Sequence, residues 1–472
     1  MAIDKYKGLV ITSSNPLKPK RVSNQLIYKT VLRKRITIIF LTFLTLVIFF
    51  SFTAIKNNSY LECRDLPIVN KGNSDQLDYF GMSMGFKIYN QWVRSFDNLY
   101  FEEWINDLDS YSIKNKICFD AFKNNIIYVQ ERFQNTFEES RFGLRPWGYP
   151  MFLSFFLDEN LNYFKLRISS FLTIVLFLFI LLLTLIKITD NKILSIGLLN
   201  VYLVISFLES FYFERISIFS YQFIIVTEPL SILIMSLIVL LFVRKNNIGF
   251  SILMLFVASY FIKQMNLFIF IFLIGFSIFY SLLKKEKFLL KTVLLVFGFV
   301  MLSLPIFQYN LSLTNNYSLM TGVGGWRDMP ASFSLEYKTK DFYQLRSELL
   351  ANYKETNGLD AKSDYIETAV LSRELFFSEL KNNLSNVPSL FVFKLSSIFF
   401  SFSVLLTFAM LVLYIFYFHL PFEKISNIIF LYFANLIFIC ITTPADGRHV
   451  FQLSFIYLII FAYIIKLKSL KN

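Results

Sequence analysis

Long apolar runs alternate with polar stretches along the chain, and this pattern predicts helices that cross a membrane. A helix needs about 20 mainly apolar residues to cross roughly 30 Å of hydrocarbon. Ten runs meet this requirement, at 36–55, 164–186, 192–209, 220–243, 248–265, 266–283, 289–307, 401–419, 425–442 and 449–466. The sequence therefore predicts an all-α polytopic membrane protein with about ten transmembrane helices.

Two long polar stretches interrupt the apolar runs and define four parts of the chain. The expected parts are a basic tail at 1–35, a transmembrane core at 36–307 with a first outer loop at about 56–163, a second outer loop at 308–400, and C-terminal transmembrane helices with a short tail at 401–472. Interfacial and amphipathic helices are expected inside both loops.

Shorter apolar pieces in the two loops carry this expectation. The piece WGYPMFLSFFL at 147–157 is too short to span a membrane, so it is interpreted as an interfacial or re-entrant helix. The segment 388–399 is similar. Apolar residues at helical spacing from 343 to 350 suggest an amphipathic helix over a membrane-level cavity, although a solvated helical face fits equally well.

The distribution of basic residues predicts the orientation. The first 35 residues carry nine Lys and Arg against one acid, Asp4. With this tail inside, ten crossings place 21 basic residues in the cytoplasm and only Arg215, Lys263 and Arg448 in the short outer turns. The positive-inside rule favours this arrangement. Both termini are therefore expected in the cytoplasm, and both long loops on the outer face.

Composition narrows the classes of protein further. Hydrophobic residues make up 55% of the chain and aromatic residues 19%, which is too apolar for a soluble enzyme of this size. The net charge of +13 follows the expected cytoplasmic loops, so membrane lipids are expected as partners and nucleic acid is not. The abundance of Phe, Ile, Asn and Lys suits a bacterial, AT-rich genome. With only two histidines, His-based zinc chemistry and a serine triad are not expected.

Cys63 and Cys118 both fall in the first outer loop, whereas Cys440 falls in an apolar span. Two loop cysteines in an oxidising compartment can pair. Two unpaired thiols fit the sequence equally well, because the sequence does not give the distance between them.

Two carboxylates are candidates for chemistry on the outer face. Asp75 and Asp78 lie three residues apart and therefore on one face of a helix, just outside the first span. Such a pair suits metal binding or general-base work. Two carboxylates on a solvated helix are the plain alternative.

Three cations and one further acid lie at the same expected level. Arg145, in the segment RFGLRPWGYP, is suited to charge-assisted hydrogen bonds with a phosphate or to snorkelling at the interface. Lys263 has the same two interpretations, and Arg448 is suited to a phosphate or to a salt bridge with Asp446. Glu228 lies in the outer third of its predicted span, where an ionisable side chain marks a functional or structural polar contact.

The order of these features resembles the polytopic GT-C glycosyltransferases. The resemblance is to the bacterial branch related to protein O-mannosyltransferases and lipid A aminoarabinose transferase, whose motifs run D-x-x-x-Y and R-P-P-x-Y-P. Here Asp75 to Tyr79 is similar to the first motif, and RPWGYP, with Trp147 in place of the second Pro, to the second. Segments that are similar in the same order lie at 226–234, 261–270, 308–325 and 446–460.

The resemblance implies an inverting transfer of a sugar from a polyprenyl-phosphate donor to a lipid, glycan or protein acceptor. The reaction is expected on the outer face of the bacterial cytoplasmic membrane, on a cell-envelope glycan or lipid. Asp75 or Asp78 is the expected catalytic carboxylate. The expected substrate-binding residues are Tyr79, Arg145, Tyr149, Glu228, Lys263 and Arg448. Some GT-C enzymes use a divalent metal and others do not, so the metal stays open, as do the sugar, the acceptor and the oligomeric state.

Three other functions remain open at this point. An O-antigen-type polymerase acts on similar lipids at the same face, although the Asp75 to Tyr79 and RPWGYP pair argues against it. A transporter or flippase of lipid-linked sugars usually has internal repeats and midplane polar residues, and no clear repeat is present. The third possibility is a non-catalytic member of the family. Trp147 and Lys263, which differ from the residues usual in the family, would then be signs of lost activity.

Overall fold

The computed structural model describes the chain in sections, and all regular elements within them are helices. The described residues are 24–62, 79–80, 82–83, 87, 113, 116–120, 148–157, 163–211, 217–224, 226–245, 250–263, 266–283, 296–298, 300–301, 304, 308, 329–357, 365–399, 401–417, 425–442 and 450–469. Within them, the prediction of an all-α protein is confirmed.

The helices have the following bounds. The α-helices are α1 (Asn24–Glu62), α6 (Gly148–Ser154), α7 (Tyr163–Thr189), α8 (Lys192–Phe211), α9 (Glu228–Lys245), α10 (Phe250–Ile262), α11 (Asn266–Leu283), α14 (Met329–Phe333), α15 (Phe342–Thr356), α16 (Tyr365–Asn383), α17 (Val387–Phe399), α18 (Phe402–Val412), α19 (Ser426–Thr442) and α21 (Ile456–Ser469). Short 3-10 helices are η1 (Ile218–Ser220), η2 (Leu335–Lys338), η3 (Leu384–Asn386) and η6 (Phe451–Leu453), and η4 (Leu413–Tyr417) is a π-helix.

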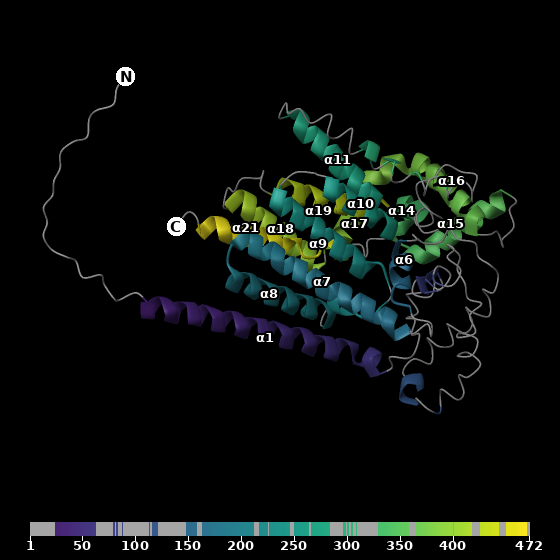
Figure 1. Ribbon diagram of the computed structural model, residues 1–472. Coiled ribbons are helices and arrows are strands. Elements are labelled where there is room, and N and C mark those ends of the chain that lie inside the picture. The colour runs from purple at the N-terminus through teal and green to yellow at the C-terminus, as the bar shows by residue number, and fades with distance from the viewer. Residues whose placement is uncertain are drawn as a thin grey trace, which may run out of the picture.

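The long helices lie side by side in one bundle, with α1 along one edge (Figure 1). Helix α7 packs against α8, α9 and α21. The ring of Phe177 in α7 lies 5.9 Å from that of Tyr202 in α8 and 5.4 Å from that of Phe455, directly before α21, measured between ring centroids. A single cluster of buried apolar side chains extends from α1 to α21. Most of the long helices therefore share one core, and α14 and α15 pack around a smaller cluster of their own.

Four helical segments are long and apolar enough to cross a membrane: Val31–Asn57, Phe164–Thr189, Lys192–Phe211 and Phe451–Ser469. A fifth candidate combines Leu371–Ile398 with Phe402–Phe416, two helical stretches bent by 100° at the break between them. The apolar helices Ser251–Ile262 and Ser426–Cys440 are shorter than the about 20 residues that a straight crossing needs. The count of ten spans therefore stays a prediction.

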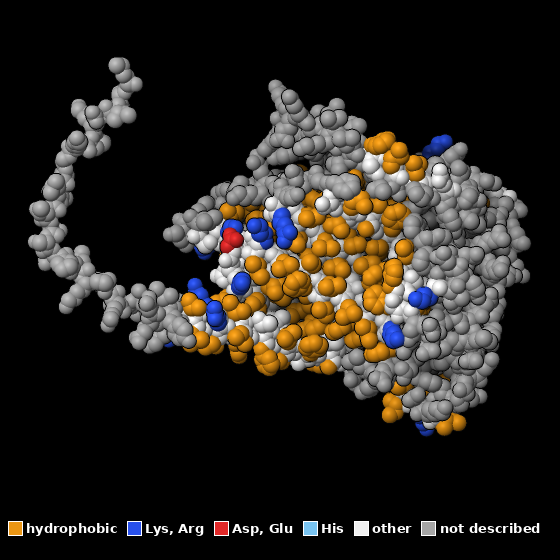
Figure 2. All heavy atoms as spheres, in the orientation of Figure 1, with side chains coloured by type: hydrophobic (Ala, Val, Ile, Leu, Met, Phe, Trp, Pro, Cys, Tyr) orange, Lys and Arg blue, Asp and Glu red, His pale blue; other side chains and the backbone are white. Residues whose placement is uncertain are grey.

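The surface of α1 has the character of a membrane-facing helix. Only 11% of its most apolar window is buried, and Ile39, Phe40 and Phe43 are among its exposed side chains. Figure 2 shows hydrophobic side chains continuing from this edge across the visible side of the bundle. Because a patch of this extent is unfavourable in water, the surface is matched to hydrocarbon.

The structure differs from the sequence prediction at the start of the span expected at 220–243. Residues 218–220 form η1, which is capped by the Ser217 hydroxyl, and α9 begins only at Glu228. Pro229 favours the later start, because proline lacks a backbone N–H and is tolerated in the first turn of a helix. Glu228 is therefore the first residue of α9, and it does not lie inside a longer helix as the sequence suggested.

Both short apolar pieces form helices, as predicted. Residues 147–157 contain α6, and 388–399 correspond to α17. The predicted amphipathic helix is α15, which buries Phe342 and Leu345 against Ala331 of α14. Helices α14, α15 and α16 lie at one end of the bundle in Figure 1. We call this the cap end.

Side-chain hydrogen bonds tie the loop between α8 and α9 to its neighbours. Asn57 of α1 donates its Nδ2 to the Gln222 Oε1 at 2.9 Å, and Ser170 of α7 donates its hydroxyl to the Ile224 carbonyl at 2.9 Å. The end of α1 and the start of α7 therefore meet the same loop, at the cap end (Figure 1).

Candidate functional site

Two tyrosines from the motifs identified in the sequence lie in direct contact. The ring of Tyr79 lies 5.0 Å from that of Tyr149 between centroids, with the planes at 89° in an edge-to-face arrangement. Tyr79 is 3% exposed and Tyr149, the second residue of α6, is 1% exposed. Edge-to-face pairs of this kind add about 0.5–1.5 kcal/mol to the free energy gained by burial alone. The structure thus joins the D-x-x-x-Y and RPWGYP segments through their tyrosines.

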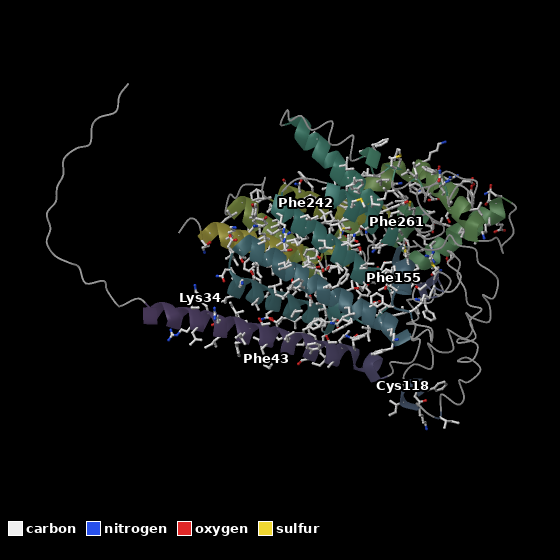
Figure 3. All side chains as sticks on the ribbon, in the orientation of Figure 1. Lys34, Phe43, Cys118, Phe155, Phe242 and Phe261 are labelled. Atoms are coloured by element: carbon white, nitrogen blue, oxygen red, sulfur yellow. The ribbon has the colours of Figure 1, made fainter. Side chains whose placement is uncertain are left out.

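Helix α6 is held against the end of α10 by a close backbone approach. A Cβ atom added to Gly148 would lie 2.7 Å from the carbonyl oxygen of Phe261 and 2.9 Å from its Cβ. Real Cβ atoms essentially never approach so closely, so only glycine fits this position without a shift of α6 or α10. Phe155, in the turn after α6, and Phe261 both lie away from Lys34, which marks the opposite end of the bundle (Figure 3).

Two further predicted residues form an ion pair beside this contact. The Nζ atom of Lys263 lies 3.5 Å from the Oε1 atom of Glu228, and the two side chains are only 10% and 1% exposed. Lys263 follows the last residue of α10, two positions after Phe261, and Thr227 donates its hydroxyl to the Glu228 Oε2 at 3.4 Å. Because an isolated buried charge is costly, each of these charged groups stabilises the other.

A chain of polar side chains continues from α9 toward the C-terminal helices. The Ser231 hydroxyl, one turn after Glu228, donates to the Gln452 Oε1 at 2.7 Å. The Gln452 Nε2 in turn donates to the Asn435 Oδ1 of α19 at 2.6 Å. All three side chains are buried. They connect the helix that carries Glu228 with η6 and α19.

Four of the eight predicted site residues lie outside the described residues. These are Asp75, Asp78, Arg145 and Arg448. The other four, Tyr79, Tyr149, Glu228 and Lys263, are described, buried and arranged in two contacting pairs. We call these four residues the paired site. For Lys263, the structure favours an ion pair over snorkelling at a helix end, because the side chain is buried against an acid.

The sequence missed several buried polar groups that the structure reveals. Arg167 in the first turns of α7 is fully buried, and so is Lys394 of α17, whose Nζ lies 5.1 Å from the centre of the Tyr337 ring. Glu209 at the end of α8 accepts the backbone N–H of Ser403 at 3.0 Å. These residues could have been found in the sequence, because each is an ionisable residue inside or beside an apolar run. An ionisable residue in such a place usually makes a polar contact.

The cysteines and possible metal ligands are described in part. Cys118 is disulfide-bonded, and Cys440 is a buried free thiol. Cys63 lies outside the described residues. Among the side chains that the structure describes, no group of three or more His, Cys, Asp or Glu is arranged to hold a metal ion.

No protein-family model, no curated protein and no solved structure matches this chain. The resemblance to GT-C glycosyltransferases therefore depends on the order of short motifs in the sequence.

Proposed function

We propose that the chain is a GT-C-type glycosyltransferase that moves a sugar from a polyprenyl-phosphate donor to an acceptor on the outer face of a bacterial cytoplasmic membrane. The observation that carries the proposal is the paired site. Its two contacts join residues from four segments that the sequence singled out separately. These segments are 75–79, 145–150, 226–234 and 261–270. If these motifs build one site, as the resemblance to the family implies, both contacts are explained.

The proposal includes a topology of ten spans with both termini in the cytoplasm. The four long apolar helices support it, as does the separation of the cap end from the end that carries Lys34, Lys187 and Lys466. Basic residues at the latter end fit the cytoplasmic side under the positive-inside rule. The paired site then lies on the outer side.

The proposed reaction is a single inverting displacement. The oxygen of an acceptor hydroxyl attacks the anomeric carbon of the sugar, and the bond from that carbon to the phosphate oxygen breaks with its electron pair remaining on the polyprenyl phosphate. Asp75 or Asp78 takes the hydroxyl proton. No covalent sugar intermediate forms on the enzyme.

The leaving phosphate needs positive charge at the interface, and Arg145, Lys263 and Arg448 are the proposed sources. Glu228 holds Lys263 in place at 3.5 Å. Tyr79 and Tyr149 are buried, so their proposed role is to hold α6 in position beside the substrate through their ring contact.

The test measures sugar transfer in isolated membranes that contain the full-length protein, supplied with a panel of radiolabelled polyprenyl-phosphate hexoses and pentoses. Asp75→Asn and Asp78→Asn are compared with the parent at matched expression. Asp120→Asn serves as the control, because Asp120 is an exposed carboxylate in the same predicted loop. We expect one of the first two variants to lose at least about 100-fold in transfer, the usual order for a general base, and the control to keep its activity.

Transfer that survives in both variants would contradict the assigned carboxylates. If the parent consumes no donor from the panel, the polymerase, the transporter or flippase, and the inactive homologue become the better explanations.

A further inference from the structure

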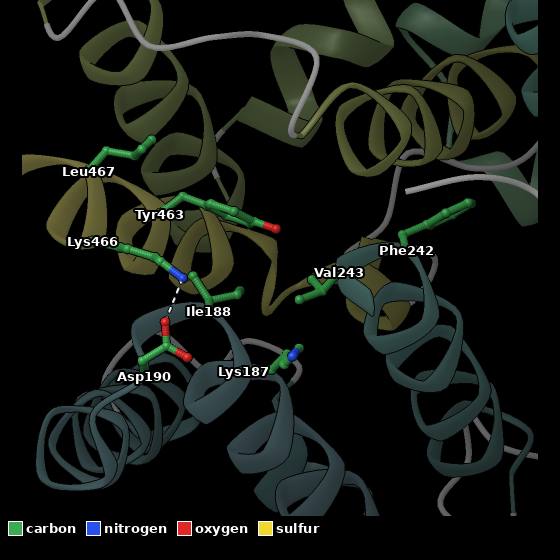
Figure 4. Close-up of a pocket in the computed structure, with 8 residues that line it drawn as sticks. All are labelled: Lys187, Ile188, Asp190, Phe242, Val243, Tyr463, Lys466 and Leu467. Atoms are coloured by element: carbon green, nitrogen blue, oxygen red, sulfur yellow. Dashed lines mark hydrogen bonds and ion pairs between the residues drawn. The ribbon is translucent and has the colours of Figure 1, made fainter. Parts of the chain in front are cut away.

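A cavity of about 340 Å³ opens at the end of the bundle opposite to the cap end. Its wall is formed by residues of α7, α9 and α21 and by the turn after α7 (Figure 4). The lining residues are Lys187, Ile188, Asp190, Phe242, Val243, Tyr463, Lys466 and Leu467. None of them belongs to the paired site, so the proposed glycosyl transfer does not account for this cavity.

The polar part of the wall is basic and firmly positioned. Lys466 donates to the Asp190 Oδ2 at 2.7 Å, so the charge of this acid is already balanced. Asp190 has a positive φ of 54°, a conformation that ends α7, and the next residue, Asn191, caps α8 by accepting the N–H groups of Ile193 and Leu194. The turn that carries Asp190 is therefore fixed at both sides.

Lys187 supplies the remaining positive charge. It lies in the last turn of α7 and is exposed, and its charge also acts on the Asp190 carboxylate, so two lysines surround one acid and one positive charge is left over. The hydroxyl of Tyr463 points toward the middle of the cavity in Figure 4 and adds a hydrogen-bond donor. An ammonium and a hydroxyl that line one cavity suit the oxygens of a phosphate.

The remaining wall is apolar. Val243 and Leu467 are half-buried and supply its exposed apolar surface, and Ile188 and Phe242 are buried behind them. A freely soluble anion gains nothing from such a surface, whereas an anion attached to a hydrocarbon chain buries that chain against it. The cavity lies where the apolar helices end, which is the depth of lipid headgroups.

We propose that this cavity binds a phosphate group, with Lys187 and the Tyr463 hydroxyl as its ligands and the apolar wall receiving an attached lipid chain. The phosphate of an anionic phospholipid and free inorganic phosphate share this chemistry, and the apolar wall favours the phospholipid. With the proposed topology, the site lies at the cytoplasmic surface. The cavity is separate from the proposed site on the outer face. Binding of a phosphate in the cavity does not require transferase activity.

The experiment follows thermal unfolding of the purified full-length protein in detergent while a phosphate probe is titrated. The lipid arm uses dioleoyl phosphatidic acid, with dioleoyl phosphatidylcholine as the neutral comparison. The second arm uses inorganic phosphate. Lys187→Gln removes one positive charge from the cavity and Lys187→Arg keeps it. Lys34→Gln is the matched control, because Lys34 is an exposed lysine of α1 at the same end (Figure 3).

We expect phosphatidic acid to raise the melting temperature of the parent, Lys34→Gln and Lys187→Arg, and Lys187→Gln to need about tenfold more lipid, since one charge-assisted contact contributes about 1.4 kcal/mol or more. A shift with inorganic phosphate alone that depends on Lys187 would support a phosphate site and identify free phosphate as its ligand. Equal shifts in the parent and Lys187→Gln, or no shift with either phosphate probe, would overturn the proposal.

Discussion

The side chains of Glu228 and Lys263 form one buried unit, with Nζ and Oε1 3.5 Å apart. Glu228 begins α9, and Lys263 follows α10. The chain enters α9 at Glu228 and has just left α10 at Lys263, so the pair joins two helix ends that lie far apart in the sequence. The negative charge of Glu228 leaves Lys263 a cation held at a fixed place in the cap end of the bundle.

Lys263→Met is expected to destabilise the protein by about 3 kcal/mol, because the buried Glu228 carboxylate would lose its ion pair with Lys263. Thermal unfolding in detergent measures the loss. The double variant Glu228→Gln/Lys263→Met is expected to recover most of this stability, since both charges are then absent. Equal stability of the single and double variants would show that the two charges are not coupled.

The same two variants separate packing from catalysis. If Lys263 binds the leaving phosphate, the double variant regains stability but not sugar transfer. Transfer that returns together with stability would mean that Lys263 contributes only to the fold.

Gly148→Ala is expected to push α6 away from α10, because the new Cβ would meet the Phe261 backbone at 2.7 Å. Overpacking of this kind costs about 1–3 kcal/mol. Gly197→Ala in α8 is the matched control, since nothing lies within 4 Å of the added atom. It should be neutral or slightly stabilising, by at most about 1 kcal/mol. Unfolding midpoints of both variants in detergent test the contrast, and equal values would argue against the close approach.

Tyr149→Ala and Tyr149→Phe test the contact between the two tyrosine rings. The alanine variant loses the edge-to-face contact with Tyr79 and should cost about 3 kcal/mol or more, as removal of a buried aromatic ring does. The phenylalanine variant keeps the ring and should retain most of the stability. The melting temperatures of the two variants show whether the ring or the hydroxyl stabilises the protein. If the phenylalanine variant is as unstable as the alanine variant, the stabilisation comes from the hydroxyl.

Glu348→Gln should weaken α15 in a pH-dependent way. Hydrogen bonds from Lys340 and then from Gln344 hold the pKa of the Glu348 carboxyl below its usual 4.5. A lowered carboxyl pKa contributes stability that is present above the unfolded-state pKa and is lost as the pH falls through the folded-state pKa. The difference between Glu348→Gln and the parent should therefore be visible at pH 7 and shrink below about pH 4.5.

Proteolysis of the folded protein within α15 measures this difference at each pH. Glu355→Gln, an exposed acid on the same helix, is the control and should behave as the parent. A difference that is equally large at low pH would contradict the role of the Lys340 contact.

Much of the fold was predictable because burial in a membrane leaves a strong one-dimensional signal. The spans that begin near 36, 164 and 192 were placed within a few residues, since each is a continuous apolar run between polar ends. The start of α9 was misplaced, because the apolar residues at 220–227 continue the hydropathy pattern without continuing the helix. Hydropathy indicates which residues are buried but not whether they are helical. The buried residues before α9 include the short capped helix η1 and not the first turns of α9.

For the candidate site, the sequence determined which residue types are present. The resemblance to a known family indicated which of these residues were candidates for the site. The sequence singled out Tyr79, Tyr149, Glu228 and Lys263 separately. Only the tertiary structure decided that they form two pairs, because a partner in space depends on how helices pack and not on distance along the chain. The same reason explains the cavity beside Lys187: its walls come from three helices, and each contributes a few side chains that are unremarkable in its own sequence.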